Sequence, residues 1–581
     1  MLRTTARRRA LVLALALLGS TSLAACTAGP AGDGGRPHAS ATPADPAARP
    51  DLRRFYGQKL VWRPCGDVRC ASLTVPMDYA RPGDGRTFVL PVARAATAVP
   101  GKRVGSLVLN PGGPGEPGAK LVEDGVADEL GKGVRDRFDV VSFDPRGVGG
   151  SAPALTCLTE DDTEAGDGTE AGDGTEPGDG TKAGDGTEPG DGTKAGDGTE
   201  PGDGTEAEED RTGAADEAPL YPRTTAERAE ALAGARAQAA ACRKASGPLL
   251  PHVGTVDVAR DLDVLRAALG ERRLTYVGWS YGTSLGTSYA EQFPRRVRAM
   301  VLDGAVDPSL DWRQRALGQS AGFRDAVEEY ADSCADVVGE GCPGSSPGEI
   351  RALIDRLLDR TRREPLPVDG SEDGVGTAGL VDALSLSMYT PEAQWEGLSE
   401  ALRAADEGDG TKLAALAADG EETPDTETDT TEAPSEEPAD DVPEDNGEAA
   451  LIAVNCLDVP HPRDAQAYWN ALAPAHAAAG LYGTSGVTGE LVCEDWPAGT
   501  QRPHRVSAPG VPPVLVVGTT GDPATPYAEA VSLARQFPGG MLLSYEAPGH
   551  TGYGRDACVD AKVEAYLVSL TRVRPGATCA P

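Results

Sequence analysis

Ser280 is the residue whose surroundings most clearly suggest chemistry. It lies at the centre of Gly278-Trp279-Ser280-Tyr281-Gly282, between an apolar run, Leu274–Val277, and a helix-compatible run, Thr283–Phe293. A serine at a sharp strand-to-helix turn has an exposed hydroxyl, and small residues two positions to either side let the flanking chains approach closely. The pattern predicts a nucleophile elbow with Ser280 as nucleophile, although a GxSxG pentapeptide by itself is also compatible with a structural turn.

A histidine must follow the serine if the chain has the serine, acid, histidine order of this strand–turn–helix architecture. His550 meets this requirement, because it lies in a glycine-flanked loop, 548–552, just after the strand-like run Met541–Tyr545. The other five histidines precede the apolar run that should carry the acid: His38, His252, His461, His476 and His504. We therefore expect His550 to be the base, the alternative being an ordinary histidine of a surface loop.

The acid is expected in the loop after a late buried strand. Val514–Val517 reads as such a strand, and the following residues, 519–523, read as the loop at its carboxyl end. Asp522 is our choice, and Asp303, which follows the strand Met300–Leu302, is the alternative. In such a triad the carboxylate orients the imidazole, and the imidazole takes the serine proton and later delivers it to the leaving group.

A glycine-rich loop could stabilise the negative charge of a tetrahedral intermediate. The apolar strand Ser106–Leu109 ends in Asn110-Pro111-Gly112-Gly113-Pro114-Gly115. Glycines let backbone N–H groups face the developing charge, so we expect an oxyanion hole made by the N–H of Gly113 and that of Tyr281, the residue after the nucleophile. The alternative is an ordinary Gly-Pro turn.

These loops need a sheet that brings them together. Phe138–Phe143 reads as a further buried strand, and one helical face precedes Gly270: Val258, Leu262, Leu265 and Leu269. Such alternation of strands and helices predicts an α/β fold with a mostly parallel sheet flanked by helices. A helical cap, inserted at residues 309–505, should contain helices near Trp312–Val337, Pro347–Arg362 and Pro391–Ala405.

Five motifs together resemble those of a known family, the secreted tripeptidyl aminopeptidase and prolyl-iminopeptidase-like serine hydrolases. The resemblance covers most of residues 55–581 and implies the α/β-hydrolase fold with a TAP-like C-terminal region. The motifs are Asn110 to Gly115, Asp144 to Gly149, Gly278 to Gly286, Gly521 to Pro526, and Gly549-His550.

The resemblance implies an exopeptidase that releases short N-terminal units from peptides with a free N-terminus, through an acyl-enzyme and without a cofactor. An esterase or other small-acyl hydrolase is an alternative, because a fold does not fix a substrate, and an inactive surface-binding lipoprotein is another. The chain departs from the family at Glu116-Pro117, where a glycine and a serine are usual. We expect Glu116 to pair with the substrate's α-ammonium, the alternative being a solvated glutamate.

The N-terminus indicates export. Four arginines among the first nine residues precede the apolar run Ala10–Leu18, and Leu23-Ala24-Ala25-Cys26 follows. The run is too short to span a bilayer, and a cysteine after Leu-Ala-Ala suggests cleavage before Cys26 and lipidation of its thiol. We expect an extracytoplasmic protein anchored by lipid to the bacterial cell membrane, or else a secreted one.

The cysteines support the same compartment. Eleven are present, and removal of a lipidated Cys26 leaves ten, which allows five disulfides. Proximity in sequence suggests these pairs: Cys65 with Cys70, Cys157 with Cys242, Cys334 with Cys342, Cys456 with Cys493, and Cys558 with Cys579. No cysteine or histidine cluster has the spacing of a zinc site, so no structural metal is expected.

The net charge of −36 is concentrated in two segments. Residues 160–217, which include seven six-residue Thr-Glu/Lys-Ala/Pro-Gly-Asp-Gly units, and residues 419–448 together carry −32. The repeats have no side chains that could form an apolar core and so do not offset the entropy of ordering, and they are expected to be disordered. Residues 419–448 are likewise expected to be disordered. The remaining −4 gives no reason to expect a nucleic-acid partner.

The expected organisation follows from these boundaries. It comprises a lipoprotein signal peptide (1–25), a flexible tether (26–50), the first part of the hydrolase core (51–308), the helical cap (309–505) and the C-terminal part of the core (506–581).

Overall fold

The computed structural model describes residues 49–157, 219–371, 374–418, 446–497, 499 and 501–581. Cys26, the six-residue repeats and residues 419–445 lie outside the described residues, so the expectations for them stay predictions. The unit Pro46–Pro581 contains both the sheet and the helices inserted into it.

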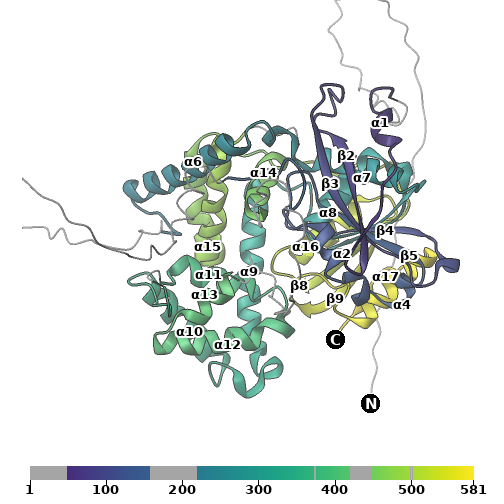
Figure 1. Ribbon diagram of the computed structural model, residues 1–581. Helices are drawn as coiled ribbons and strands as arrows, with labels where there is room; N and C mark the ends of the chain where they lie inside the picture. Colours follow the sequence, from purple (N-terminus) through teal and green to yellow (C-terminus); the bar gives the residue numbers. More distant parts are fainter. Residues whose placement is uncertain (1–48, 158–218, 372–373, 419–445, 498, 500) are drawn as a thin grey trace, which may run out of the picture. The chain divides into compact units, whose positions relative to one another are not determined.

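The strands of the described chain form a mixed sheet, seen in the right-hand part of Figure 1. Its order is β1-β2-β3-β5-β4-β6-β7-β8-β9-β10, antiparallel from β1 to β5 and parallel from β5 onward. The strands are β1 (Arg63–Cys65), β2 (Val68–Pro76), β3 (Thr87–Ala95), β4 (Gly105–Asn110), β5 (Phe138–Phe143), β6 (Leu274–Trp279), β7 (Val297–Asp303), β8 (Leu515–Gly521), β9 (Met541–Pro548) and β10 (Ala577–Cys579). The predicted α/β class with a mostly parallel sheet is confirmed.

Side chains of the central strands alternate between two apolar layers, one on each face of the sheet. Val108 of β4 packs in the layer on one face of the sheet, and its neighbours Leu107 and Leu109 pack in the layer on the other. Because successive side chains of a strand point to opposite faces, a strand covered on both sides is mostly apolar. β4 and β5 are buried at every position, and the polar side chains of β5 have partners: the Ser142 hydroxyl donates to the Leu109 carbonyl, and Asp139 accepts the Thr97 N–H.

Helices cover both faces of this sheet. The first layer contains apolar residues of α1 (Arg53–Tyr56), α7 (Thr255–Ala268), α8 (Tyr281–Gln292) and α16 (Tyr527–Gln536). The second layer contains those of α2 (Gly118–Glu123), α3 (Val126–Glu129), α4 (Lys132–Arg135) and α17 (Ala557–Ser569). The sheet and these helices are called the core below.

The inserted helices form a group with its own apolar interior, called the cap below (Figure 1). Tyr330 and Trp395 are fully enclosed there and meet edge to face, with ring centroids 5.3 Å apart. The cap consists of α9 (Trp312–Val337), α10 (Pro347–Thr361), α11 (Thr377–Leu386), α12 (Pro391–Glu407), α13 (Thr411–Ala418), α14 (Gly447–Asp458), α15 (Ala465–Gly489, broken at 479–480) and the 3₁₀ segment η6 (Glu490–Asp495).

Helix α6 (Thr225–Ser246) lies before the cap in sequence but packs against η6. A capping box at Thr224 and Glu227 starts the helix. Arg236 then pairs with Glu494 of η6 at 2.9 Å. Residues from the first half of the chain therefore contribute to the surroundings of the cap.

Five disulfides join segments of the described chain, and their pairs are those expected from proximity in sequence. Cys157–Cys242 closes the segment that carries the repeats, and Cys456–Cys493 joins α14 to η6. A disulfide of this kind stabilises a fold by about 2–4 kcal/mol, chiefly by restricting the unfolded chain. None of the helices in the described ranges has the length and apolarity needed to cross a bilayer.

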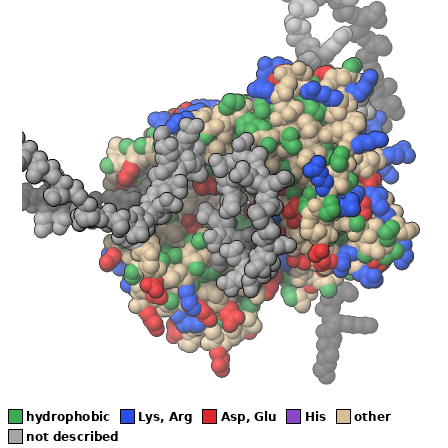
Figure 2. Space-filling view, viewed as in Figure 1, with side chains coloured by type: hydrophobic (Ala, Val, Ile, Leu, Met, Phe, Trp, Pro, Cys, Tyr) green, Lys and Arg blue, Asp and Glu red, His purple; other side chains and the backbone are tan. Residues whose placement is uncertain are grey.

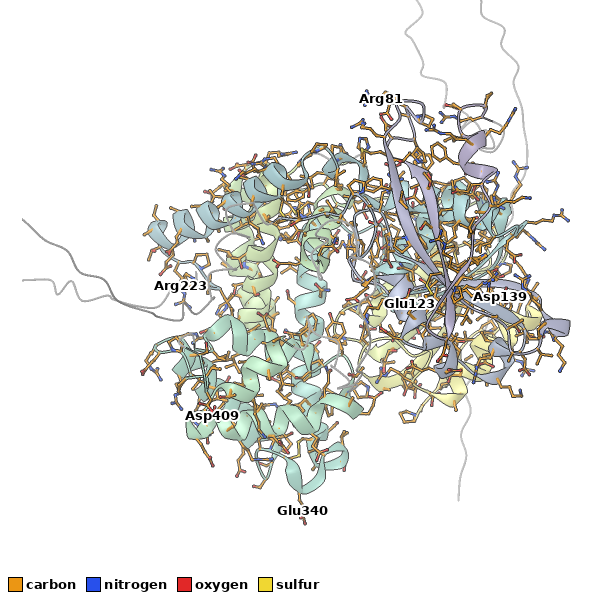
Figure 3. All side chains as sticks on the ribbon, in the orientation of Figure 1. Arg81, Glu123, Asp139, Arg223, Glu340 and Asp409 are labelled. Carbon is orange, nitrogen blue, oxygen red and sulfur yellow. A yellow bond between two sulfur atoms is a disulfide. The ribbon has the colours of Figure 1, made fainter. Side chains whose placement is uncertain are left out.

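Charged side chains occupy the surface of both parts (Figures 2 and 3). Residues 49–104, which contain β1 to β3, have eleven basic and four acidic side chains. Arg81, at the β2–β3 hairpin, pairs with Asp78 at 2.9 Å, and Glu340 and Asp409 lie on the cap (Figure 3). Exposed pairs contribute only about 0–1 kcal/mol each, so the apolar layers account for most of the stability.

Candidate active site

Ser280 lies at a strained turn between β6 and α8. Its φ of 53° and ψ of −124° fall outside the regions that most side chains adopt. The turn requires glycine on both sides: a Cβ at Gly278 would lie 2.3 Å from the carbonyl oxygen of Gly282, and one at Gly282 would lie 2.7 Å from Oδ1 of Asn110. The Ser280 N–H donates to the Asp303 carbonyl at 2.8 Å, which ties the turn to the neighbouring strand β7. This is the geometry of a nucleophile elbow.

The glycine-rich loop after β4 packs directly against the serine. A Cβ built on Gly112 would lie 3.0 Å from the Cβ of Ser280 and 3.6 Å from its Oγ, and Gly112 and Gly113 both have positive φ. Gly113 and Tyr281 line the same cavity as Ser280. Tyr281 is the first residue of α8, so its N–H has no partner within that helix. Both predicted oxyanion donors therefore belong to segments that border the serine.

His550 and Asp522 are brought together at the carboxyl end of the sheet. The Nδ1 of His550 lies 2.8 Å from Oδ1 and 3.0 Å from Oδ2 of Asp522. The carboxylate also accepts the N–H groups of Ala524, Thr525 and Thr551. A carboxylate fixed by three backbone donors is well placed to hold an imidazole in one tautomer and one orientation.

The electrostatics favour a positive charge on His550. Burial disfavours the charged imidazole, but the nearby Asp522 carboxylate and its hydrogen bond outweigh it and raise the His550 pKa. The Nε2 atom is buried and has no hydrogen-bond partner in the described ranges of the chain. Because Nδ1 is taken by Asp522, Nε2 is the nitrogen left to exchange a proton with a serine.

Asp303, the alternative acid, has a different role in the structure. It is fully buried at the end of β7 and accepts the N–H groups of Gly552 and Tyr553 at 3.0 and 2.7 Å. Burial raises the Asp303 pKa to about 6. Asp303 thus holds the backbone of the loop that carries His550, while Asp522 contacts the imidazole itself.

A cavity of about 290 Å³ opens at Ser280 between the core and the cap. Core residues in its wall include Gly113, Pro114, Tyr281 and Thr525, and cap residues include Trp312, Phe323, Tyr389, Asn455 and Glu490. Tyr389 joins this wall to His550: its carbonyl accepts the His550 N–H at 2.8 Å, and the two rings meet edge to face at 5.2 Å. Both Ser280 and a direct neighbour of His550 therefore border one cavity.

Two carboxyl groups lie in the wall of this cavity. Glu490 uses Oε2 to bond Nε2 of His461 at 2.5 Å, and Glu529 accepts the N–H of Asp307 at 2.8 Å. Burial raises the Glu529 pKa to about 7. Neither carboxyl group was identified from the sequence, because each lies in a helical segment that contains no catalytic motif.

Glu116 is exposed and is not among the residues that line the cavity. Its neighbour Gly115 packs on the start of α14, where a Cβ would lie 2.5 Å from the Gly447 carbonyl oxygen. Asn446, just before α14, accepts the Gly149 N–H and donates to the Gly147 carbonyl, both at 2.9 Å. The oxyanion loop is thus buttressed by the cap, and the proposed contact of Glu116 with an ammonium stays a prediction.

The far end of α14 is also attached to the catalytic segments. The hydroxyls of Tyr281 and Thr255 share a hydrogen bond of 2.5 Å, and the Thr255 N–H donates to Asp458, the last residue of α14, at 3.0 Å. Burial raises the Asp458 pKa to about 6. A polar chain therefore links the residue after the nucleophile to the cap, although no motif marks Thr255 or Asp458 in the sequence.

The second family motif, Asp144 to Gly149, has a structural explanation. Arg146 is completely enclosed and makes two hydrogen bonds to Asp261, of 2.7 and 2.6 Å, as well as bonds to backbone carbonyls. Asp144 accepts the N–H groups of Ala119 and Gly150. A bidentate buried pair of this kind fixes the loops beside the oxyanion segment.

The fold and this site define a serine hydrolase of the α/β-hydrolase class. Comparison with known families agrees: residues 105–340 match the family described as alpha/beta hydrolase fold, and residues 479–579 match the family described as TAP-like protein. Both matches were expected from the motifs.

Three relatives sharpen the classification. The chain is 35% identical to the serine protease Hip1 of Mycobacterium tuberculosis over 90% of this chain and 91% of that protein. It is 30% identical to the tripeptidyl aminopeptidase of Streptomyces coelicolor over 90% and 84% of the two chains, and 31% identical to the carboxylesterase B of Mycobacterium tuberculosis over 99% of each. The chain belongs to the α/β-hydrolase family with a TAP-like C-terminal region that contains these enzymes, and it is a serine hydrolase of that family.

Proposed function

We propose that this enzyme is an exopeptidase that removes short units from the N-terminus of peptides, with Ser280, His550 and Asp522 as its catalytic residues. The observation that carries the proposal is the placement of two carboxyl groups, Glu490 and Glu529, in the cavity that opens at Ser280. A carboxylate at a fixed distance from the nucleophile would pair with a substrate's α-ammonium and set the length of the released unit.

In the proposed mechanism, His550 accepts the Ser280 proton at Nε2 as the serine oxygen attacks the scissile carbonyl carbon. The oxyanion of the tetrahedral intermediate accepts hydrogen bonds from the N–H groups of Gly113 and Tyr281, each worth about 3 kcal/mol of barrier. His550 then gives the proton to the leaving amine, and the acyl-enzyme forms. Water repeats the sequence, and Asp522 stabilises the imidazolium in both halves.

Glu490 is the stronger candidate for the ammonium. Its Oε1 makes no hydrogen bond within the described part of the chain, while its other oxygen is held by His461. Burial raises the Glu529 pKa to about 7, so its contribution to ammonium binding grows as pH rises through neutrality and ends at a pH of about 8, where the peptide's own α-ammonium loses its proton. Glu116, expected from the sequence to play this part, is a competing candidate.

The test compares tripeptide anilides that differ only at the N-terminus. We expect a free-amine substrate to be cleaved with a kcat/KM at least tenfold above that of its acetylated form, since a charged hydrogen bond contributes about 1.5–3 kcal/mol. Glu490→Gln should abolish that preference by raising KM. Glu116→Gln is the matched variant: it should keep the preference if Glu490 binds the ammonium and abolish it if Glu116 does. Equal cleavage of free and acetylated peptides would contradict the exopeptidase proposal.

An esterase is the second candidate, favoured by the carboxylesterase B name of one relative. The same nucleophile and oxyanion hole would serve both reactions. An esterase would hydrolyse p-nitrophenyl acetate and butyrate with kcat/KM far above that of any peptide anilide. The reverse order is expected if peptides are the substrates.

We also propose that the enzyme acts outside the cytoplasm and is anchored by lipid on Cys26. The leader sequence and five disulfides, which form in oxidising compartments, support this location. Mass spectrometry of the N-terminal peptide from membranes should show a diacylglyceryl modification on Cys26 that is lost in Cys26→Ser. An unmodified cysteine in membrane-free culture medium would instead indicate secretion.

A further inference from the structure

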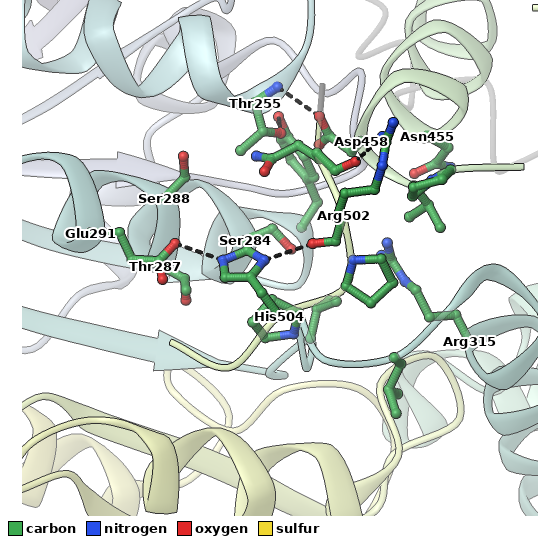
Figure 4. A pocket seen from close by; sticks show the side chains of 18 residues that line it. Thr255, Ser284, Thr287, Ser288, Glu291, Arg315, Asn455, Asp458, Arg502 and His504 are labelled. Atoms are coloured by element: carbon green, nitrogen blue, oxygen red, sulfur yellow. Dashed lines mark hydrogen bonds and ion pairs between the residues drawn. The ribbon is translucent and has the colours of Figure 1, made fainter. Parts of the chain in front are cut away.

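A second, smaller cavity of about 70 Å³ adjoins the cavity at Ser280 (Figure 4). We call it the side pocket. The two cavities share lining residues: Tyr281, Val306, Arg315, Asn455 and Val459. Because the residue next to the nucleophile borders both, a substrate held at Ser280 could extend a side chain into the side pocket.

One wall of the side pocket is a row of hydroxyl groups on α8. Ser284, Thr287 and Ser288 are three and four residues apart, which places them on the same face of the helix. Thr287 is only 3% exposed, and its Oγ1 has no hydrogen-bond partner among the residues that the structure describes. Buried hydroxyls are usually paired, so this atom calls for a polar group from outside the chain.

Arg315 of α9 lies on the opposite wall (Figure 4). Its positive charge lowers the pKa of both Asp458 and Glu529, partly countering the effect of their burial. Over the described ranges, however, its guanidinium forms no hydrogen bond and no ion pair within 4 Å. A guanidinium has five N–H donors, and those of Arg315 are open to a ligand in either cavity.

The other charged groups of the side pocket already have partners. His504 pairs with Glu291 at 3.0 Å, and this hydrogen bond raises the His504 pKa to about 9. Arg502 donates to the backbone carbonyls of Gly499 and Gln501. Asp458 accepts the Thr255 N–H. Arg315 shares its charge with Asp458 and Glu529 at longer range, and it is the basic group of this pocket whose N–H donors a ligand would use.

We propose that the side pocket is a subsite for a carboxylate-bearing side chain of the peptide substrate, aspartyl or glutamyl, held by Arg315 and the Thr287 hydroxyl. Guanidinium matches carboxylate in geometry and charge, and a hydroxyl donates to the remaining lone pair. The side pocket is the smaller of the two cavities and has room for a short side chain such as aspartyl or glutamyl. The inference rests on the proposed peptidase function and adds a substrate class to it.

The experiment uses the full mature enzyme and a set of free-amine tripeptide anilides. Each position of Ala-Ala-Ala is replaced in turn by Asp or by its neutral isostere Asn, and kcat/KM is measured for every member. We expect Asp to exceed Asn by on the order of tenfold or more at one position, the energy of a charged hydrogen bond. In Arg315→Gln the Asp to Asn ratio at that position should fall to about one.

Two further variants control for structural damage. Arg313→Gln removes an exposed arginine two residues away on the same helix and should leave the ratio unchanged. Thr287→Val keeps the side-chain shape and should lower the ratio several-fold. Labelling of Ser280 by a fluorophosphonate reports whether each variant retains a folded site.

The outcomes separate this inference from the proposed function. Equal cleavage of Asp and Asn peptides by the unaltered enzyme would overturn the side-pocket assignment and leave the peptidase intact. An equal loss for both peptides in Arg315→Gln would also overturn it, because Arg315 would then bind a peptide carbonyl. Failure to cleave any peptide while esters are hydrolysed would overturn both proposals.

Discussion

The core and the cap hold the polar groups of the site in different ways. In the core, polar groups at the site are fixed by backbone: three N–H groups hold Asp522, and two hold Asp303. In the cap, Glu490 faces the cavity and is held by the side chain of His461, and the Arg315 guanidinium has no hydrogen-bond partner among the residues that the structure describes. Backbone anchoring suits chemistry that tolerates little displacement, while side-chain anchoring lets recognition vary without disturbing the catalytic geometry.

The largest effect is expected from a substitution in the core. Ser280→Ala removes the nucleophile and should lower kcat by a factor on the order of 10⁶ with little change in thermal stability. Residual activity near that of the unaltered enzyme would show that another group attacks the substrate. Thr283→Ala, one turn along α8, is the comparison variant: its buried hydroxyl donates to the Ser280 carbonyl and accepts the Val306 N–H, so this change removes support of the turn and keeps the nucleophile.

The two buried aspartates of the core give the next largest effect and a sharper distinction. Asp522→Asn should lower kcat on the order of 10⁴-fold, because the imidazole loses the partner that fixes its tautomer. Asp303→Asn should cost about 1–3 kcal/mol of unfolding free energy by disturbing two buried hydrogen bonds, with a smaller loss of kcat. The opposite ranking in kcat would make Asp303 the catalytic acid.

The pH dependence of kcat/KM tests the electrostatic effect of Asp522 on His550. The His550 pKa is raised, so the imidazolium persists above the ordinary value of about 6.5, and kcat/KM should fall as pH drops through this raised pKa. In Asp522→Asn the raising charge is absent, so the acid limb of the profile should move to lower pH. An acid limb that does not move would show that Asp522 exerts no electrostatic effect on the base.

The same comparison explains what could be predicted from sequence. Residues of the core site lie at strand ends, where a local strand–turn–helix pattern marks them: Ser280 follows β6, Gly113 follows β4 and Asp522 follows β8. β8 extends four residues beyond its apolar run, through an irregular pairing with β9, and this extension delivers Asp522 directly to His550. Local patterns therefore sufficed for the fold and for the contact of Asp522 with His550, while the catalytic triad that includes Ser280 stays a prediction.

The cap residues that line the cavity at Ser280 are not marked by a local strand–turn–helix pattern. Tyr389, Glu490 and Arg315 come from segments whose helical patterns indicate burial but not which helix meets which. The predicted helices near 312–337, 347–362 and 391–405 are present as α9, α10 and α12, yet their packing depends on long-range contacts that a single sequence does not specify. Glu116, which the sequence predicts as ammonium ligand from its place beside the oxyanion loop, lies outside the cavity wall, and its contact with an ammonium stays a prediction.

The smallest expected effect concerns a segment that belongs to neither part. Deletion of Thr163–Gly204 should leave kcat/KM for tripeptide anilides within about twofold. If the repeats are disordered, as their composition predicts, shortening them changes the closure entropy of the segment by less than about 1 kcal/mol. Cys157–Cys242 would still join the flanking segments, α6 included. The measurement is thermal unfolding together with kinetics, under oxidising conditions. A loss of stability well above 1 kcal/mol would mean that the repeats pack on the core or the cap. The repeats would then be a third part of the folded structure, beside the core and the cap.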